Sequence, residues 1–305
     1  MSPEARAFLD ASGPLPPPPA SRAGLQQMRE GTLEGFRPAA ESVRDQCVDE
    51  IRETELGGVR TWQVHPKTRA GREPGFTILY FYGGGFIQGS PFEDLPIIGR
   101  IAEETGAIVH APWYRLSPEH PFPAAHEDAL AAYRAICDSA DGGPFAVMGE
   151  SAGGNLALAT VLNARASELQ LPASMALLSP WSDLTEGPDS IVTNDGHDPT
   201  LNASYLRFAA DAYRGGRDTS DPLISPVFAE CGSDMPPTII TTGTRDLLLS
   251  HSICQARALE KAGADVTLRV WDGMWHVFEF YPDLPEAQCS LSEVAAHLLG
   301  TATRR

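Results

Sequence analysis

From residue 59 onward, short strand-like runs alternate with helix-like segments. The strand-like runs are Val59–His65, Thr77–Tyr82, Ala107–Trp113, Phe145–Gly149, Ser174–Leu178, Thr238–Thr242 and Val266–Trp271. The helix-like segments are Pro96–Thr105, Ala124–Asp138, Ala152–Leu169, Leu248–Ala262 and Glu286–Leu299. Several strands are continuously apolar, as strands covered on both faces must be. The alternation therefore predicts an α/β fold in which helices flank a mostly parallel central sheet.

The first fifty residues do not follow this alternation. Two helix-like segments, Pro3–Ala11 and Ala23–Glu30, flank the proline run Leu15–Pro19. Proline fixes φ and disfavours helix in the residue before it, so this run must be extended. It is either a spacer between the two helices or a ligand for a binding module.

A long interval interrupts the alternation a second time. About sixty residues rich in Asp, Pro and Gly lie between the strand that ends near Leu178 and the strand that starts at Thr238. That is too long for a simple connection in a compact domain. We interpret it as an insertion, partly helical around Asn202–Tyr213.

The composition excludes several classes of partner. The 305 residues include 23 Lys and Arg but 40 Asp and Glu, a net charge of −17 with a pI near 4.8. Such a surface repels phosphate backbones and anionic lipid, which argues against nucleic acid and membranes as partners. No run approaches the ~20 apolar residues that span a bilayer. The five scattered cysteines include no C-x-x-C pair, so we expect no metal site or disulfide framework, and a cytoplasmic location.

The segment Gly149-Glu150-Ser151-Ala152-Gly153-Gly154 matches the G-x-S-x-G pattern of a nucleophilic serine. The pattern alone is weak, but here it lies between a buried strand and a helix-like segment, as a nucleophile turn requires. Small neighbours permit the tight turn, and the helix N-terminus adds positive potential where an oxyanion would form. Ser151 is therefore the predicted nucleophile, and a simple helix N-cap is the alternative.

A serine nucleophile needs a base and a residue that orients the base, and in this arrangement they follow in the order serine, acid, histidine. His276 follows the last strand on a loop, whereas the other downstream histidines lie in helices or in the insertion: His197, His251 and His297. Asp246 follows the strand Thr238–Thr242 and is the predicted acid. Two other aspartates near strand ends stay open as alternatives, Asp183 and Asp272.

The glycine run Gly83-Gly84-Gly85 follows the strand Thr77–Tyr82. Consecutive glycines let the backbone approach a substrate and turn two N–H groups toward it, as an oxyanion hole requires. The alternatives are a phosphate-binding loop, for which the P-loop lysine and spacing are missing, or a bare turn.

Together these motifs resemble the hormone-sensitive-lipase-like branch of the α/β-hydrolases, the bacterial group IV esterases. The matching segments are Tyr82–Phe86, Tyr114–Glu119, Gly149–Gly154, Asp221–Pro226 and the surroundings of Asp246 and His276. The resemblance implies a Ser151, Asp246 and His276 triad. It also implies that the oxyanion hole is formed by the N–H groups of Gly84, Gly85 and Ala152. Residues 51–305 would form the catalytic domain, with a cap built from residues 1–50 and an insertion at about 183–220.

Three positions depart from the family pattern. Tyr82 replaces the histidine before the glycine run, Ser250 replaces an aspartate four residues after the triad acid, and Val277 replaces a glycine after the catalytic histidine. We expect the Tyr82 hydroxyl to donate a hydrogen bond to a backbone carbonyl and so support Gly83 and the rest of the loop. The alternative is that Tyr82 lines the alcohol side of the pocket.

The resulting prediction is a serine carboxylesterase that hydrolyses small or short-acyl esters through an acyl-enzyme. It implies no metal or cofactor and a small-molecule ester as the partner, and it is compatible with a homodimer. Two alternatives stay open: an amidase or N-deacylase with the same triad, and a small-ligand receptor on the same fold. Receptors of this kind have lost the triad histidine, so His276 argues against the second alternative.

Overall fold

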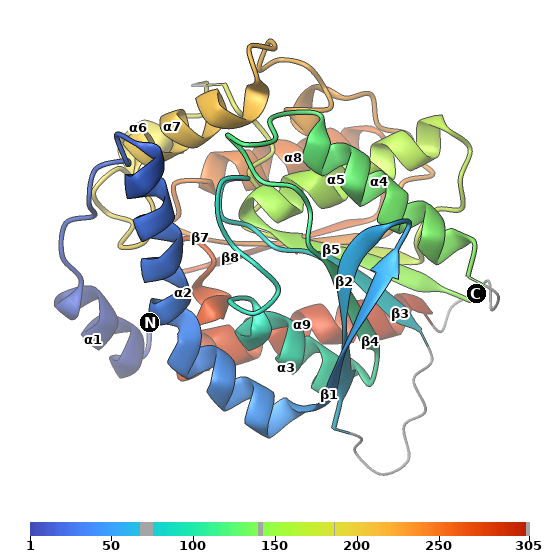
Figure 1. Cartoon of the computed structure of the whole chain (residues 1–305), viewed down its shortest axis with the longest axis horizontal. Coiled ribbons are helices and arrows are strands. Elements are labelled where there is room, and N and C mark those ends of the chain that lie inside the picture. The colour runs from blue at the N-terminus through green and yellow to red at the C-terminus, as the bar shows by residue number, and fades with distance from the viewer. Residues whose placement is uncertain (68–75, 140–142, 186, 303–305) are drawn as a thin grey trace.

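The computed structural model describes residues 1–67, 76–139, 143–185 and 187–302. Its centre is one eight-stranded sheet in the order β1-β2-β4-β3-β5-β6-β7-β8 (Figure 1). The strands are β1 (Val48–Leu56), β2 (Val59–Pro66), β3 (Thr77–Phe81), β4 (Ile108–Pro112), β5 (Phe145–Glu150), β6 (Ser174–Leu178), β7 (Thr238–Gly243) and β8 (Val266–Trp271). Strands β3 to β8 are parallel, whereas β2 is antiparallel to both β1 and β4. The predicted mostly parallel sheet is confirmed.

Helices cover both faces of this sheet. In Figure 1, α3 and α9 lie below it and α4, α5 and α8 lie above it. Their bounds are α3 (Leu95–Thr105), α4 (Ala124–Cys137), α5 (Ser151–Ala166), α8 (Leu249–Lys261) and α9 (Pro285–Ala302). Every residue of β5 and β6 is buried between the two layers, which explains their continuously apolar sequences.

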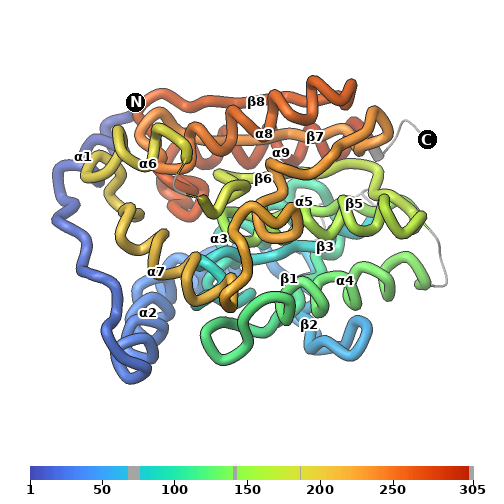
Figure 2. Tube along the Cα trace, turned by 90° about the horizontal axis from the view of Figure 1, so that it is seen from above, coloured from blue at the N-terminus to red at the C-terminus, as the bar shows by residue number. Residues whose placement is uncertain are grey.

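The remaining helices gather at one end of the molecule. Two come from the N-terminal region and two from the interval after β6, and both views place them together on the left (Figures 1 and 2). They are α1 (Pro3–Ala11), α2 (Arg22–Cys47), α6 (Ser190–Thr193) and α7 (Ala203–Arg214). Two short 3₁₀ helices complete the fold, η1 (Pro226–Phe228) and η2 (Phe278–Phe280). None of the helices among the described residues is long and apolar enough to cross a membrane.

The seven predicted strands and the helices of the alternating region are present at nearly the predicted positions. Strand β1 was missed because its sequence, Val-Asp-Glu-Ile-Arg-Glu-Thr-Glu-Leu, is polar and mostly exposed at the sheet edge. Strand β1 begins at Val48, two residues before the expected boundary at residue 50. Residue 186 of the predicted insertion and residues 68–75, 140–142 and 303–305 of the predicted catalytic domain lie outside the described residues.

Helix α2 is much longer than the predicted segment Ala23–Glu30. It continues through Pro38 to Cys47 and buries Leu25, Ala40 and Val43 along one side. A proline inside a helix removes a hydrogen bond and disfavours the preceding turn. Packing of this buried side against α3 supplies the compensating stabilisation that local sequence rules do not include.

Candidate active site

The predicted nucleophile lies on a sharp turn between β5 and α5. Ser151 is the first residue of α5 and has φ of 52°, in the left-handed region that side-chain-bearing residues rarely adopt. Glycine is needed on both sides, because a Cβ at Gly149 would overlap the Gly153 carbonyl and a Cβ at Gly153 would overlap the carbonyls of Phe81 and Tyr82. The close contacts of this turn thus explain why small residues surround the serine.

The side chains of Ser151, His276 and Asp246 form one hydrogen-bonded chain. The distance from His276 Nε2 to Ser151 Oγ is 2.9 Å, and that from His276 Nδ1 to Asp246 Oδ1 is 3.0 Å. Asp246 is fully buried, and it also accepts hydrogen bonds from the Thr242 hydroxyl and the Leu248 N–H. These contacts leave the imidazole one orientation, with Nε2 directed at the serine.

The alternative residues do not join this chain. The Asp183 carboxylate accepts a hydrogen bond from the N–H of Thr185, two residues along its own loop. Asp272 and His197 are exposed, and His251 and His297 lie inside helices α8 and α9, as expected. Among the aspartates and histidines weighed from the sequence, only Asp246 and His276 contact one another in the described structure.

A cavity of about 170 Å³ opens in front of Ser151. Its lining includes Gly84 and Gly85 of the glycine run, with φ of 86° and 64°, and the apolar side chains of Trp181 and Leu206. Ala152 is the residue immediately after the serine, at the start of α5. The cavity therefore joins the serine to the glycine loop, with room for a small ligand.

Tyr82 packs behind the glycine run, against Tyr114. The two rings are stacked, with centroids 4.2 Å apart and an interplanar angle of 13°. The Tyr82 hydroxyl donates to the Tyr114 carbonyl at 3.2 Å, and the single proton of the Tyr114 hydroxyl is shared between the carbonyls of Tyr82, at 2.7 Å, and Gly83, at 3.2 Å. Tyr82 is only 1% exposed and is not among the described residues that line the cavity. In the sequence, Tyr114 is recognisable only as part of a family motif, and no local pattern indicates this contact.

Glu150 is a second residue whose contact with the glycine run no local sequence pattern indicates. Its buried carboxyl accepts the N–H of Gly83, and a Cβ at Gly83 would collide with it. Burial, together with the neighbouring carboxyl of Asp94, raises the pKa of Glu150 well above the ordinary glutamate value. The residue between Gly149 and Ser151 thus anchors the start of the glycine run.

Polar side chains from α2 and α7 also reach the glycine run. The hydroxyl of Thr32 on α2 donates to the side chain of Gln88, whose amide donates to the Tyr205 hydroxyl on α7 at 2.9 Å. Tyr205 in turn donates to the Gly84 carbonyl at 3.2 Å. This chain connects both of the regions predicted as a cap to the loop beside Ser151.

The segment after β6 also contacts the turn that carries Asp246. Asn194 donates to the Asp246 carbonyl at 2.8 Å, and the Ser190 hydroxyl donates to the Leu247 carbonyl at 2.6 Å. Ser250, one of the departures from the family pattern, exchanges two hydrogen bonds with Ser190. The serine at this position is therefore part of the contact between α6 and the start of α8.

Val277, another departure, lines the cavity next to His276 and has φ of 45°. The left-handed region is the one that favours glycine, which agrees with the glycine expected at this position. Its N–H donates to the Ser179 hydroxyl at 3.2 Å, which helps to hold this conformation. The valine side chain reduces the space in front of the histidine.

The pKa values of His276 and Asp246 depend on each other. Burial lowers the pKa of His276, but the charge of Asp246 and its hydrogen bond outweigh this and raise the pKa above the ordinary histidine value. Burial likewise raises the pKa of Asp246, but the same interactions with His276 hold it below the ordinary aspartate value. The pair is arranged so that an imidazolium would be stabilised when it forms.

A family profile described as the α/β-hydrolase fold matches residues 78–280. The chain therefore belongs to the α/β-hydrolase family. Among curated proteins, it is 37% identical over 237 residues to an acetyl-hydrolase of Streptomyces hygroscopicus, which covers 77% of this chain and 79% of that protein. It is 34% identical over 212 residues to an ethyl acetate hydrolase of Pseudomonas putida, covering 67% of this chain and 66% of that protein.

The chain is also similar to solved structures of enzymes that are named as lipases or esterases. A hormone-sensitive lipase from a metagenome library superimposes with a TM-score of 0.86 at 33% identity, covering 99% of each chain. An esterase/lipase from an uncultured bacterium has a TM-score of 0.87 at 32% identity, with the same coverage. The predicted resemblance to the hormone-sensitive-lipase-like esterases is confirmed, and the enzyme class is carboxylic ester hydrolase.

Proposed function

We propose that this enzyme hydrolyses small or short-acyl carboxylic esters through an acyl-enzyme on Ser151. The observation that carries the proposal is the continuous hydrogen-bonded chain Ser151–His276–Asp246 facing a small cavity. The relatives named acetyl-hydrolase and ethyl acetate hydrolase support short acyl groups. A related esterase, soaked with p-nitrophenyl butyrate, adds a further short-acyl example.

In the first half-reaction, Ser151 Oγ attacks the ester carbonyl carbon while His276 Nε2 accepts the hydroxyl proton. The N–H groups of Gly84, Gly85 and Ala152 stabilise the negative charge that develops on the carbonyl oxygen. His276 then gives its proton to the alcohol oxygen as the carbon–oxygen bond breaks. The buried Asp246 carboxylate holds the imidazole tautomer and stabilises the imidazolium without taking the proton.

In the second half-reaction, water takes the place of the serine hydroxyl. His276 removes a proton from the water, whose oxygen attacks the acyl carbon of the Ser151 ester. The tetrahedral intermediate uses the same N–H donors, and His276 returns the proton to Ser151 as the acid leaves. Over the two half-reactions, one ester and one water are converted into one carboxylic acid and one alcohol.

The role of Ser151 is tested by Ser151→Ala and by labelling with an organophosphate. We expect kcat to fall by roughly 10⁴- to 10⁶-fold with little change in the thermal unfolding midpoint. The organophosphate should label the parent enzyme stoichiometrically at Ser151. Ser292→Ala, which removes an exposed hydroxyl on α9, is the matched control and should keep full activity. Near-full turnover by Ser151→Ala, or labelling at another serine, contradicts the assignment.

The substrate range is tested with p-nitrophenyl esters of graded acyl length and with the corresponding anilides. A cavity of about 170 Å³ lined by Trp181 and Leu206 accommodates acetyl and butyryl groups better than decanoyl groups. We expect kcat/KM to fall steeply with acyl length and esters to be preferred over anilides. A preference for anilides would instead identify an amidase, and binding of an ester without turnover would identify a receptor.

We propose further that α1, α2, α6 and α7 form a cap on the catalytic domain. Their position at one end of the molecule (Figure 2) supports this. The hydrogen-bonded chain from Thr32 through Gln88 and Tyr205 to Gly84 supports it as well. Thr32→Val and Tyr205→Phe each break this chain, so they should lower kcat and change substrate preference with little change in the thermal unfolding midpoint. Unchanged kinetics of both variants would contradict a cap.

The proposal also covers the cellular compartment and the oligomeric state of the enzyme. All five cysteines are free, which agrees with a reducing cytoplasm. Strand β8 ends the sheet, and Val270 on it is 45% exposed, so a homodimer would form most readily along this edge. Sedimentation velocity measures the assembly, and a single monomer boundary at micromolar concentration contradicts the homodimer.

A further inference from the structure

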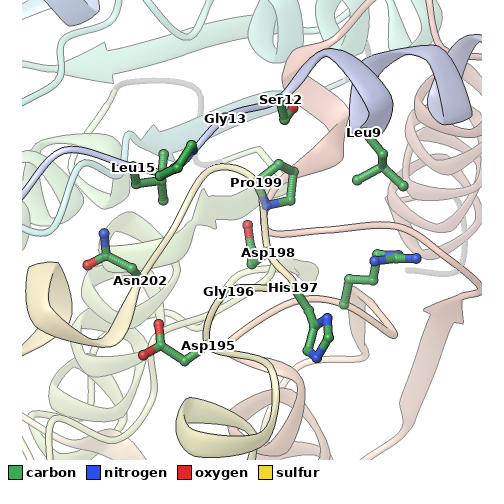
Figure 3. Close-up of a pocket in the computed structure, with 12 residues that line it drawn as sticks. Leu9, Ser12, Gly13, Leu15, Asp195, Gly196, His197, Asp198, Pro199 and Asn202 are labelled. Carbon is green, nitrogen blue, oxygen red and sulfur yellow. The ribbon is translucent and has the colours of Figure 1, made fainter.

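Asp198 occupies the junction between the two loops that carry the proposed acid and base. It belongs to the loop between α6 and α7, which Figure 3 shows opposite the segment from Leu9 to Leu15 across a cavity of about 640 Å³. Asp198 is only 4% exposed. Its Oδ2 accepts the N–H of Leu247, at 3.2 Å, and the N–H of His276, at 3.0 Å. Oδ2 of Asp198 therefore connects the backbone of Leu247, next to the proposed acid, with the backbone of the proposed base, His276.

The other carboxylate oxygen is held by the loop itself. Oδ1 accepts the N–H and the hydroxyl of Thr200, both at 2.9 Å, and the N–H of Leu201 at 3.1 Å. The Thr200 hydroxyl also lies 3.3 Å from the His276 carbonyl. The carboxylate is thus fixed on one side by its own loop and fixes His276 on the other.

We propose that Asp198 is a positioning residue for the triad, an ionised carboxylate that aligns His276 with Asp246 and stabilises the imidazolium. The proposal rests on the catalytic roles given above. Asp198 acts through the histidine and not on the substrate, since it is not among the described residues that line the catalytic cavity. No sequence pattern indicated it, because it lies 78 positions before His276.

The hydrogen bonds of Asp198 favour its ionised form. All five are donated to it, so a proton on either oxygen would replace an acceptor with a donor facing another donor. Burial and the nearby Asp246 raise the pKa of Asp198 to about 6, which still leaves the carboxylate ionised at neutral pH. Its charge is one of the interactions that raise the pKa of His276.

Other titratable groups lie around this junction. They are Arg245 and Asp246 on the turn before α8, His251 on α8, His276, Glu279 and Tyr281 after β8, and Asp195 and His197 on the same loop as Asp198. Asp246 and Glu279 remain next to the imidazole when Asp198 is neutralised. The pKa of His276 should therefore fall without losing its largest stabilising partner.

The test is Asp198→Asn, assayed with p-nitrophenyl acetate across pH. In one amide orientation the asparagine NH₂ group faces the N–H groups of Leu247 and His276, and in the other it faces those of Thr200 and Leu201. Either the His276 backbone or the loop that holds residue 198 against it must therefore shift. A small misalignment of a catalytic base costs roughly tenfold to a hundredfold, so we expect kcat to fall by that amount with KM little changed. We also expect the acidic limb of kcat/KM to move down by roughly half a pH unit.

Asp195→Asn is the matched control. Asp195 is an exposed carboxylate three residues earlier in the same loop, and its one hydrogen bond, from the Ala203 N–H, can be kept by the asparagine oxygen. It removes the same charge without touching the Asp198 contacts. Its kcat and its pH profile should match those of the parent enzyme.

Thr200→Val is the second variant, in case Asp198→Asn does not fold. It keeps the Asp198 carboxylate and removes one of the five donors together with the contact between the Thr200 hydroxyl and the His276 carbonyl, so kcat should fall several-fold while the acidic limb moves less than in Asp198→Asn. The proposal is wrong if Asp198→Asn folds and keeps both kcat and the limb, or if only its thermal midpoint drops. A Thr200→Val enzyme with parental kcat would contradict it as well. If Ser151→Ala is inactive while Asp198→Asn is unchanged, this inference alone fails and the proposed function stands.

Discussion

The paired tyrosines behind the glycine run allow a quantitative prediction. Tyr82→Phe keeps the stacked ring and removes one hydrogen bond of 3.2 Å, to the Tyr114 carbonyl. Tyr114→Phe also keeps the stack but removes a bifurcated hydrogen bond, whose single proton is shared between the Tyr82 carbonyl at 2.7 Å and the Gly83 carbonyl at 3.2 Å. These carbonyls belong to the two residues before Gly84, so the Tyr114 hydroxyl holds the glycine run more directly than the Tyr82 hydroxyl does.

The expected magnitudes follow from the hydrogen bond that each variant loses. A neutral hydrogen bond contributes about 0.5–1.5 kcal/mol net, and each 1.36 kcal/mol of barrier changes a rate tenfold. If the whole loss appears in the transition state, Tyr82→Phe lowers kcat about fivefold, and Tyr114→Phe, whose bond is shorter and reaches two carbonyls, lowers it about tenfold. Both losses correspond to less energy than the ~2.7–4 kcal/mol typical of losing an oxyanion donor itself.

The assay measures kcat and KM on two acetate esters that differ only in the alcohol. A loop-holding role predicts the same fractional loss of kcat on both esters for each variant. Tyr133→Phe is the control, because its buried hydroxyl donates to the Gln170 carbonyl away from the site, so the change should affect stability but not kcat. The reasoning is refuted if Tyr82→Phe costs more than Tyr114→Phe. It is also refuted if kcat is unchanged while the alcohol preference shifts, since Tyr82 would then act on the alcohol side of the pocket.

Three further predictions concern the same site. Asp246→Asn should lower kcat by roughly 10⁴-fold by permitting the wrong imidazole tautomer, while Asp183→Asn should cost far less; the reverse ranking in a side-by-side assay overturns the choice of acid. Because the neutral imidazole is the base and the pKa of His276 is raised, kcat/KM should rise with pH through a midpoint above about 6.5, whereas a plateau extending well below pH ~5 is incompatible with a histidine base. Tyr205→Phe should lower kcat about fivefold by freeing the Gly84 carbonyl from α7, with unchanged kcat arguing against that contact.

Much of the fold could be predicted from local pattern. Strands buried on both faces are continuously apolar, so β3 and β5 to β7 were recognisable from short windows of sequence. Strand β1 was not, because an edge strand with a polar sequence carries no such signal. The length of α2 was also missed, since the packing that carries the helix past Pro38 involves residues far away in the chain.

The candidate active site likewise combines features that local sequence predicts with features that only the tertiary structure shows. The sequence by itself determined the strand-turn-helix around Ser151, the glycine run and the proposed order of serine, acid and histidine, because each depends on neighbouring residues and on strand ends. Only the tertiary structure favours Asp246 over Asp183 as the proposed acid, through a carboxylate oxygen 3.0 Å from His276 Nδ1. It alone also revealed Asp198, which meets the backbone of His276 across 78 positions of sequence. Such contacts depend on how distant loops pack at the sheet edge, and no local pattern of residues encodes that distance.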